Sequence, residues 1–148
     1  MIRRPTPPRF DPPEGLYVKL DMQSAGRDLV VTTREHTFDN GLLRVVVPKH
    51  FRTDLGTLPI LMYLLVSPYG RPQRGFLVHD VLYKSQACSR PLADAVLREA
   101  HLENGVGWWT RFLSYWGVRL FGWSAWWKNK NRRDAFRRWM QANGGLVE

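Results

Sequence analysis

A histidine and an aspartate stand side by side in an apolar segment of the sequence, where polar groups are costly. His79 and Asp80 lie in the run FLVHDVLY, and Tyr83 follows His79 by four residues, which places both rings on one face of a helix. Burying an unpartnered polar group costs roughly 2 to 7 kcal/mol, and burying a charge costs more. We therefore expect His79 and Asp80 to have polar or ionic partners.

Two further aspartates are candidates to complete such a site. Asp54 stands in the loop between a predicted strand and a predicted helix, where it also suits a helix cap, and Asp94 lies on the helix after Asp80. Two antiparallel helices joined by a short turn bring Asp94 close to His79. Imidazole and carboxylate groups bind divalent cations, and a bound cation activates water. One hypothesis makes Asp54, His79, Asp80 and Asp94 the metal ligands and catalytic groups of a small hydrolase, with Tyr83 orienting or polarising the substrate.

The alternative is a buried polar network that holds no metal. In that network Asp80 pairs with Arg98 or Arg74, and His79 bonds to Tyr83 or to a backbone carbonyl. A serine nucleophile is not favoured, because Ser67, Ser85 and Ser89 lack the sharp glycine-flanked turn that exposes one.

The last third of the chain interleaves tryptophan with arginine and lysine. Such a pattern suits phosphate contact with base stacking, an interfacial membrane helix, or a protein interface anchored by Trp and Arg, and a basic run also suits a solvated face. At helical spacing, Trp116 and Leu120 are expected in the core. The residues predicted to bind a partner or a polyanion are Trp126, Trp127, Lys128, Lys130, Arg132, Arg133 and Arg137.

The elements that must position these groups follow from the hydrophobic pattern. Leu16–Leu20, Asp28–Thr33 and Leu42–Val47 are predicted to form a small antiparallel β-meander, with a turn at Asp39-Asn40-Gly41 and His36 as a solvated loop histidine beside it. The predicted helices come later, with Ser89 as an N-cap and a stop at Asn104-Gly105. They span Ile60–Val66, Arg74–Lys84, Ser89–Glu103, Trp108–Phe121 and Trp123–Met140.

The expected fold is therefore α+β: the N-terminal meander packs on a C-terminal bundle of about four to five α-helices. Residues 1–15 hold five prolines and are predicted to be an extended arm. Residues 16–142 form one domain, with strands in 16–48 and helices in 59–142, and residues 143–148 are expected to fray.

Composition and charge limit the kinds of partner and the cellular compartment that suit the chain. The 148 residues carry a net charge of +9, so polyanions should be attracted. The single cysteine, Cys88, excludes an internal disulfide and fits a reducing cytoplasm. The N-terminus lacks the apolar run of a signal peptide, and the longest apolar run, Leu58–Val66, is too short to span a bilayer.

Four motifs resemble one known family. The strings VPKHFRTDLGTLP, SPYGRPQRGFLVHDVLY, SRPLADAVLREA and YWGVRLFGW, from Val47 to Trp123, are similar in order and content to the bacteriophage and prophage family catalogued as domain of unknown function 1353. The resemblance implies a phage or prophage origin and no established activity. The recurring polar positions of the family correspond here to Thr53, Asp54, His79, Asp80, Tyr83 and Asp94.

Three functions follow as hypotheses. The first is a virion- or tail-associated structural protein that binds other phage proteins or itself, with the His-Asp cluster structural or holding an ion. The second is the metal-dependent hydrolase, and the third is a nucleic-acid-binding accessory protein that uses the basic C-terminus. The expected location is the virion or the cytoplasm of a bacterial host.

Overall fold

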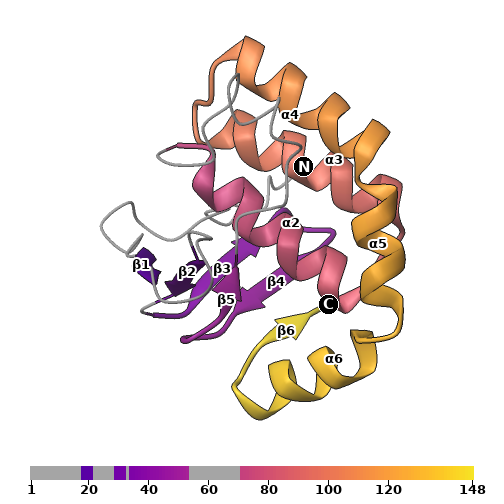
Figure 1. The fold of residues 1–148 in the computed structure, drawn as a ribbon. Coiled ribbons are helices and arrows are strands. Elements are labelled where there is room, and N and C mark those ends of the chain that lie inside the picture. The colour runs from indigo at the N-terminus through magenta and orange to yellow at the C-terminus, as the bar shows by residue number, and fades with distance from the viewer. Residues whose placement is uncertain (1–17, 22–28, 33, 54–70) are drawn as a thin grey trace, which may run out of the picture.

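The computed structural model describes residues 18–21, 29–32, 34–53 and 71–148. Within them, antiparallel strands occupy the N-terminal part and five helices the C-terminal part, which confirms the predicted α+β class (Figure 1). The predicted arm at 1–15, the predicted helix Ile60–Val66 and Asp54 lie outside the described residues.

The strands form two antiparallel sheets instead of one meander. The first sheet has the order β1 (Val18–Asp21), β2 (Leu29–Thr32) and β5 (Arg52–Thr53). The second has the order β3 (His36–Asp39), β4 (Arg44–Val47) and β6 (Leu146–Val147).

Strand β3 corrects the expectation that His36 lies in a solvated loop. His36 is buried in β3, where burial alternates along the strand and also places Phe38 inward. The predicted turn at Asp39-Asn40-Gly41 is confirmed, but it joins β3 to β4. Gly41 adopts a φ of 83°, and its N–H donates to the Asp39 carboxylate over 2.8 Å.

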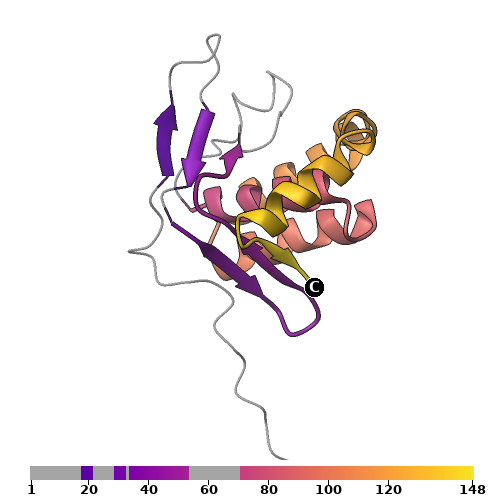
Figure 2. The ribbon, with the colours of Figure 1, turned by 90° about the horizontal axis from the view of Figure 1, so that it is seen from below.

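The end of the chain is not frayed, contrary to expectation. β6 pairs with β4, with Val147 opposite Val45, and the N–H of Glu148 donates to the carbonyl of Arg44 over 2.9 Å (Figure 2). Gly144, at a φ of 82°, reverses the chain after the last helix. The glycines that predicted fraying instead make the turn that adds a third strand to the sheet.

Three helices have nearly the predicted bounds: α2 (Gln73–Ser85), α3 (Arg90–Glu103) and α4 (Trp108–Phe121). Ser89 caps α3, because its side chain accepts from the N–H of Leu92 over 3.4 Å. Gly105, at a φ of 67°, follows its end as predicted. None of the described helices has the length and apolarity needed to cross a bilayer.

The predicted helix Trp123–Met140 is in fact two helices, α5 (Trp123–Lys130) and α6 (Arg133–Ala142). The chain turns at Asn131-Arg132, and α6 packs against α2. Figure 2 shows α6 in front of the other helices, with β6 following it. On α6, Met140 is buried and Phe136 packs edge-on against Phe51, with ring centroids 5.8 Å apart. A straight helix would carry both apolar side chains away from the core, so burial of this face explains the break.

Helix α2 is the centre of the core. It packs against α3, α5, α6 and β4 (Figure 1). Most of its residues are buried, including the polar pair His79 and Asp80, as the apolar surroundings of that pair predicted. A helix buried on most sides must find partners for its polar groups, either on neighbouring helices or one turn away on the same helix.

Candidate functional site

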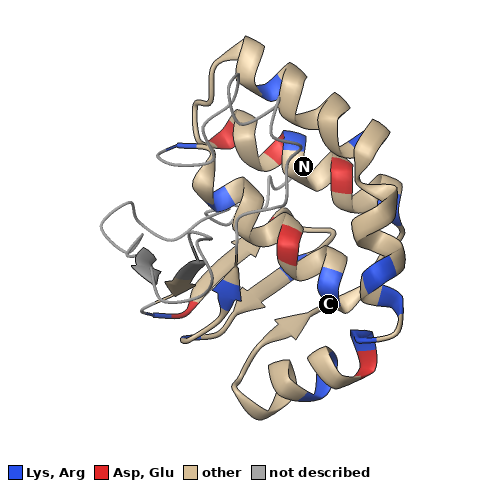
Figure 3. Ribbon diagram, in the orientation of Figure 1, with Lys and Arg blue, Asp and Glu red and all other residues tan. Residues whose placement is uncertain are grey.

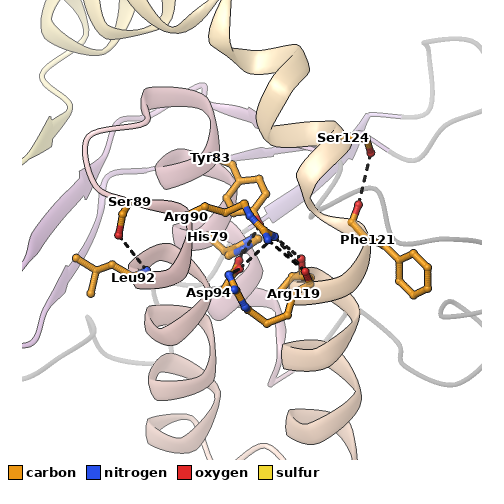
Figure 4. Close-up of polar contacts among 10 residues, drawn as sticks. His79, Tyr83, Ser89, Arg90, Leu92, Asp94, Arg119, Phe121 and Ser124 are labelled. Atoms are coloured by element: carbon orange, nitrogen blue, oxygen red, sulfur yellow. Dashed lines mark hydrogen bonds and ion pairs between the residues drawn. The ribbon is translucent and has the colours of Figure 1, made fainter.

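Two antiparallel helices bring the predicted site residues together. α2 ends at Gln86, which adopts a left-handed conformation at a φ of 48°, and α3 begins after the Ser89 cap. This short connection places Asp94, on the second turn of α3, beside His79 and Tyr83 of α2 (Figure 4). The predicted proximity of Asp94 to His79 is thus observed.

The carboxylate of Asp94 is the centre of the cluster and is fully buried. Its Oδ1 lies 2.9 Å from Nε2 of His79 and accepts from the Tyr83 hydroxyl over 2.7 Å. Its Oδ2 accepts from Nη1 of Arg119, on α4, over 2.9 Å, and Nη1 of Arg90 lies 3.6 Å away (Figure 4). Both oxygens therefore have partners, as a buried carboxylate requires.

Protonation of the cluster follows from these contacts. Burial alone would raise the pKa of Asp94, but hydrogen bonds from His79, Tyr83 and Arg119 outweigh burial and leave the pKa below its ordinary value. Burial, reinforced by the hydrogen bond to Asp94 and its charge, raises the pKa of Tyr83, so the phenol stays protonated and donates. Asp94 is thus an ionised acceptor at neutral pH.

Arg90 extends the cluster to the end of α4. Its Nη1 donates to the carbonyl of Val118 over 3.1 Å, and both Nη atoms donate to the carbonyl of Arg119, at 3.2 and 3.3 Å. The last carbonyls of a helix are short of partners within it. The Val118 carbonyl accepts from the N–H of Gly122 over 2.9 Å as well, and the guanidinium of Arg90 caps this end of α4. Asp94, Arg90 and Arg119 together tie α4 to α3.

Asp80 points away from this cluster. Its Oδ2 lies 3.0 Å from Nζ of Lys84, one turn later on α2, so the predicted pairing with Arg98 or Arg74 is wrong. Arg98 is exposed and lies over the ring of Tyr115 instead. Adjacent helix positions diverge by about 100°, which explains why His79 and Asp80 serve different neighbours.

The metal hypothesis has a partial donor set in the described part of the chain. His79 and Asp94 are adjacent, but no group of three His, Cys, Asp or Glu side chains that could hold a metal occurs among the described residues. Asp54, the fourth predicted ligand, lies outside them. The metal site therefore stays a prediction that depends on Asp54.

Two members of the cluster, Arg90 and Arg119, were not predicted from the sequence. Arg90 precedes Asp94 by four residues, a helical spacing that indicates an ion pair. Arg119 comes from another helix, and no spacing in the sequence signals its contact with Asp94.

The predicted Trp/Arg binding residues do not form one surface. Trp126 packs against Tyr83, with ring centroids 5.2 Å apart, whereas Trp127 is exposed. Arg137 donates to the carbonyls of Ser85 and Gln86, at 2.7 and 2.9 Å, so its role is structural. Lys128, Lys130 and Arg132 are also exposed, at the corner of α5 and α6 (Figure 3).

Trp116 and Leu120 lie outside the core, contrary to expectation. They are 48% and 61% exposed. Helix α4 buries its other face, with Ser114, Gly117 and Val118, against the rest of the molecule. Its apolar residues are more numerous than one buried face accommodates, and the excess is exposed.

A comparison with known protein families assigns the chain to one of them. It belongs to the family described as "Protein of unknown function (DUF1353)", whose model matches residues 30–118. The match runs from β2 into α4 and so includes His79, Asp80, Tyr83 and Asp94, while Arg119 lies one residue beyond it. No curated protein and no solved structure matches the chain.

Proposed function

We propose that the chain is a structural protein of a bacteriophage or prophage particle, which docks through α4 and α5 onto another protein of that particle. The phage origin rests on the family resemblance. The docking function rests on one observation, the row of exposed aromatic and aliphatic side chains on these two helices. We call it the aromatic row.

The aromatic row contains most of the exposed apolar bulk of the described residues. Eight of the eleven large apolar side chains that are exposed there belong to it, each between 44% and 65% exposed. Half-exposed aromatic side chains contribute roughly 100 Å² each, so the row exceeds the few hundred Å² typical of a monomer surface. Its members are Trp108, Trp109, Phe112, Trp116, Leu120, Phe121, Trp123 and Trp127.

The spacing aligns most of the row along α4 and α5. Trp108, Phe112, Trp116 and Leu120 recur every four residues on α4, and Trp123 and Trp127 do so on α5. Gly122 joins the two helices with helical dihedral angles, so α5 continues α4 with only a bend (Figure 1).

The charge of α4 and α5 indicates which kind of protein binds the aromatic row. α4 and α5 carry Arg111, Arg119, Lys128 and Lys130 and no acidic residue (Figure 3). Two copies of the row facing each other would bring like charges together, which disfavours self-association. The row instead fits a protein with an apolar groove edged by Asp and Glu, in the helix-in-groove mode.

The Asp94 cluster gives this surface a fixed position. Arg119 and Arg90 attach the C-terminal turn of α4 to the buried carboxylate at the point where the row passes from α4 to α5. A rigid docking helix loses less entropy on binding than a mobile one. The polar residues of the Asp94 cluster thus have a structural use in this proposal.

The experiment is to purify phage particles from a lysogen that produces the tagged chain and to quantify the chain in them. The chain should be present, and Trp116→Gln, Leu120→Gln and Trp123→Gln should each lower its amount. Leu42→Gln is the matched control, because Leu42 is 93% exposed in the β3–β4 turn and outside the row. Absence of the wild-type chain from the particles would contradict the proposal, and so would a stable dimer that the row variants disrupt.

A second candidate, the metal-dependent hydrolase, is favoured by the 2.9 Å contact between Nε2 of His79 and Asp94. If Nε2 carries the proton, Nδ1 has the lone pair needed to bind a metal or accept a proton. The test is elemental analysis of the purified chain with its His79→Gln and Asp54→Ala variants. Stoichiometric metal lost from both folded variants supports this candidate, and a metal-free wild-type chain after growth with divalent metals counts against it.

A further inference from the structure

A concave site lies at the junction of β5, α2 and α6, away from the Asp94 cluster. It is a pocket of about 480 Å³, within the range of small-ligand sites. The lining residues are His50, Phe51, Arg52, Lys84, Asn129, Arg132, Ala135, Phe136 and Trp139. The family model ends at residue 118, so α5 and α6 add a wall of this pocket from outside the matched segment.

Aromatic rings form one wall of the pocket. Phe136 and Trp139 stack on each other, with ring centroids 6.0 Å apart and planes 20° apart. Phe51 is fully buried beneath them and meets Phe136 at 63°. Flat π-faces of this kind accept a planar aromatic group by stacking, at roughly 1 to 3 kcal/mol per nucleic-acid base.

Positive charge surrounds this aromatic wall. None of the described lining residues is acidic, while Arg52, Lys84 and Arg132 are cations. Lys84 is held in place by Asp80 at 3.0 Å and by the carbonyl of Arg52 at 3.2 Å. Arg52 and Arg132 are exposed and have no carboxylate partner among the described residues, so their charge is available to an anion.

The loop that carries His50 is shaped unusually. His50 has a φ of 67°, in the left-handed region that side chains other than glycine seldom adopt. Its N–H donates to the carbonyl of Thr32 over 2.9 Å, which holds the loop at the mouth of the pocket.

From these observations we infer that this pocket binds a nucleotide, either free or as a unit of a single strand. The base would stack on Trp139 and Phe136, and the phosphate would pair with Arg52 and Arg132. Lys128 and Lys130, exposed on the adjoining α5, extend the positive surface beyond the pocket, as a strand would need. This site is separate from the aromatic row and does not depend on the docking function.

The probes distinguish binding of the base from binding of the phosphate. They also distinguish a free nucleotide from a nucleotide within a single strand. Calorimetric titration of the full chain with AMP, adenosine and inorganic phosphate compares base plus phosphate with each part alone. Fluorescence anisotropy with a labelled oligothymidine of about 12 nucleotides tests the single strand. AMP should bind more than about tenfold tighter than adenosine or phosphate, because stacking and ion pairing act together.

Variants then locate the site. Arg52→Gln and Arg132→Gln remove exposed cations without disturbing the core, and each should weaken binding at least about fivefold, about 1 kcal/mol. Arg138→Gln is the matched control: Arg138 is exposed on the same helix as Phe136 and does not line the pocket. It should change binding by less than about twofold.

The outcomes are distinct. Binding of both AMP and the oligonucleotide supports a nucleotide pocket, and binding of the oligonucleotide alone assigns the pocket to a single strand. The inference is overturned if neither probe binds, or if Arg138→Gln weakens binding as much as Arg132→Gln, since the attraction would then be general charge.

Discussion

The guanidinium of Arg119 lies 2.9 Å from the carboxylate of Asp94, which joins the end of α4 to a fully buried position on α3. The Arg119 side chain is 27% exposed, whereas that of Asp94 is not exposed at all. Loss of the Arg119 guanidinium and loss of the Asp94 carboxylate should therefore lower the stability of the fold by different amounts. Removing the arginine leaves Asp94 with His79, Tyr83 and Arg90, but removing the carboxylate takes a shared acceptor away from all four side chains, of which His79 and Tyr83 are buried.

The first prediction follows from that asymmetry. Asp94→Ala should lower the free energy of unfolding by about 3 to 5 kcal/mol, as breaking a buried ion pair does. Arg119→Gln should cost less, because water reaches its guanidinium. Urea unfolding of both variants and of the double variant gives the coupling energy, which should be about 1 to 3 kcal/mol.

Arg98→Gln serves as the control for that cycle, because Arg98 is exposed and its guanidinium lies over the Tyr115 ring. It should cost under about 1 kcal/mol and show no coupling to Asp94→Ala. A coupling near zero between Asp94 and Arg119 would mean that the pair does not hold α4.

The second prediction concerns pH and His101. Burial is the main reason that the pKa of His101 falls from 6.5 to about 4, with further lowering by His79 and Arg111 and partial compensation by the Pro72 carbonyl. Between pH 6.5 and about 4, His101 therefore binds a proton in the unfolded chain but stays neutral in the folded chain. Stability should fall as pH drops from about 6.5 to about 4, by about 3 kcal/mol in total.

The measurement is urea unfolding at several pH values for the wild type and for His101→Gln, which has no titrating ring. The variant should lose much less stability across that interval. The lowered pKa of Asp94 acts in a separate window, because its contribution is present above the ordinary pKa of 3.8 and is lost only at more acidic pH. Equal slopes for both proteins between pH 6.5 and 4 would contradict the assignment to His101.

Local sequence signals predicted the elements that local signals control. The Ser89 cap, the Gly105 stop and the bounds of α4 depend on neighbours within a few residues, and the structure agrees with them. The adjacency of Asp94 to His79 was also predictable, since a short turn between two helices constrains them.

Three features that the sequence analysis missed depend on contacts between distant segments. β6 exists because β4 offers it an edge about 100 residues earlier in the chain. The break after Lys130 depends on a core in which Phe136 meets Phe51. Arg119 finds Asp94 only once α4 has docked on α3. Periodicity and capping carry no information on such pairings, so the sequence left them open.

The third prediction tests the packing of α2 on α3. A Cβ at Gly75 would overlap the ring of His101, which supplies all three of the nearest atoms. Gly75→Ala should therefore cost about 1 to 3 kcal/mol by overpacking, despite the better helix propensity of alanine. The same change in a His101→Ala background should cost much less, because the ring is gone. Urea unfolding of the four proteins measures this, and a cost of Gly75→Ala that is unchanged without the ring would place the strain elsewhere.

The last prediction concerns β6. Deleting Leu146–Glu148 removes the two backbone hydrogen bonds between Arg44 and Glu148, at 2.8 and 2.9 Å, and uncovers one edge of β4. It also removes Val147, which packs against the core. The truncation should cost about 1 to 3 kcal/mol in the free energy of unfolding.

Hydrogen exchange separates the two parts of that loss. The amide of Arg44 donates to the carbonyl of Glu148, so its protection should disappear in the truncated chain. Val147→Ala removes packing but keeps the strand, so the Arg44 amide should stay protected while stability falls by a smaller amount. The β3–β4 pairing provides the internal reference, because the amides bonded between Phe38 and Val45 lie on the other edge of β4 and should keep their protection in both proteins. If the Arg44 amide exchanges as fast in the full chain as in the truncated one, β6 does not pair in solution and the last residues are frayed.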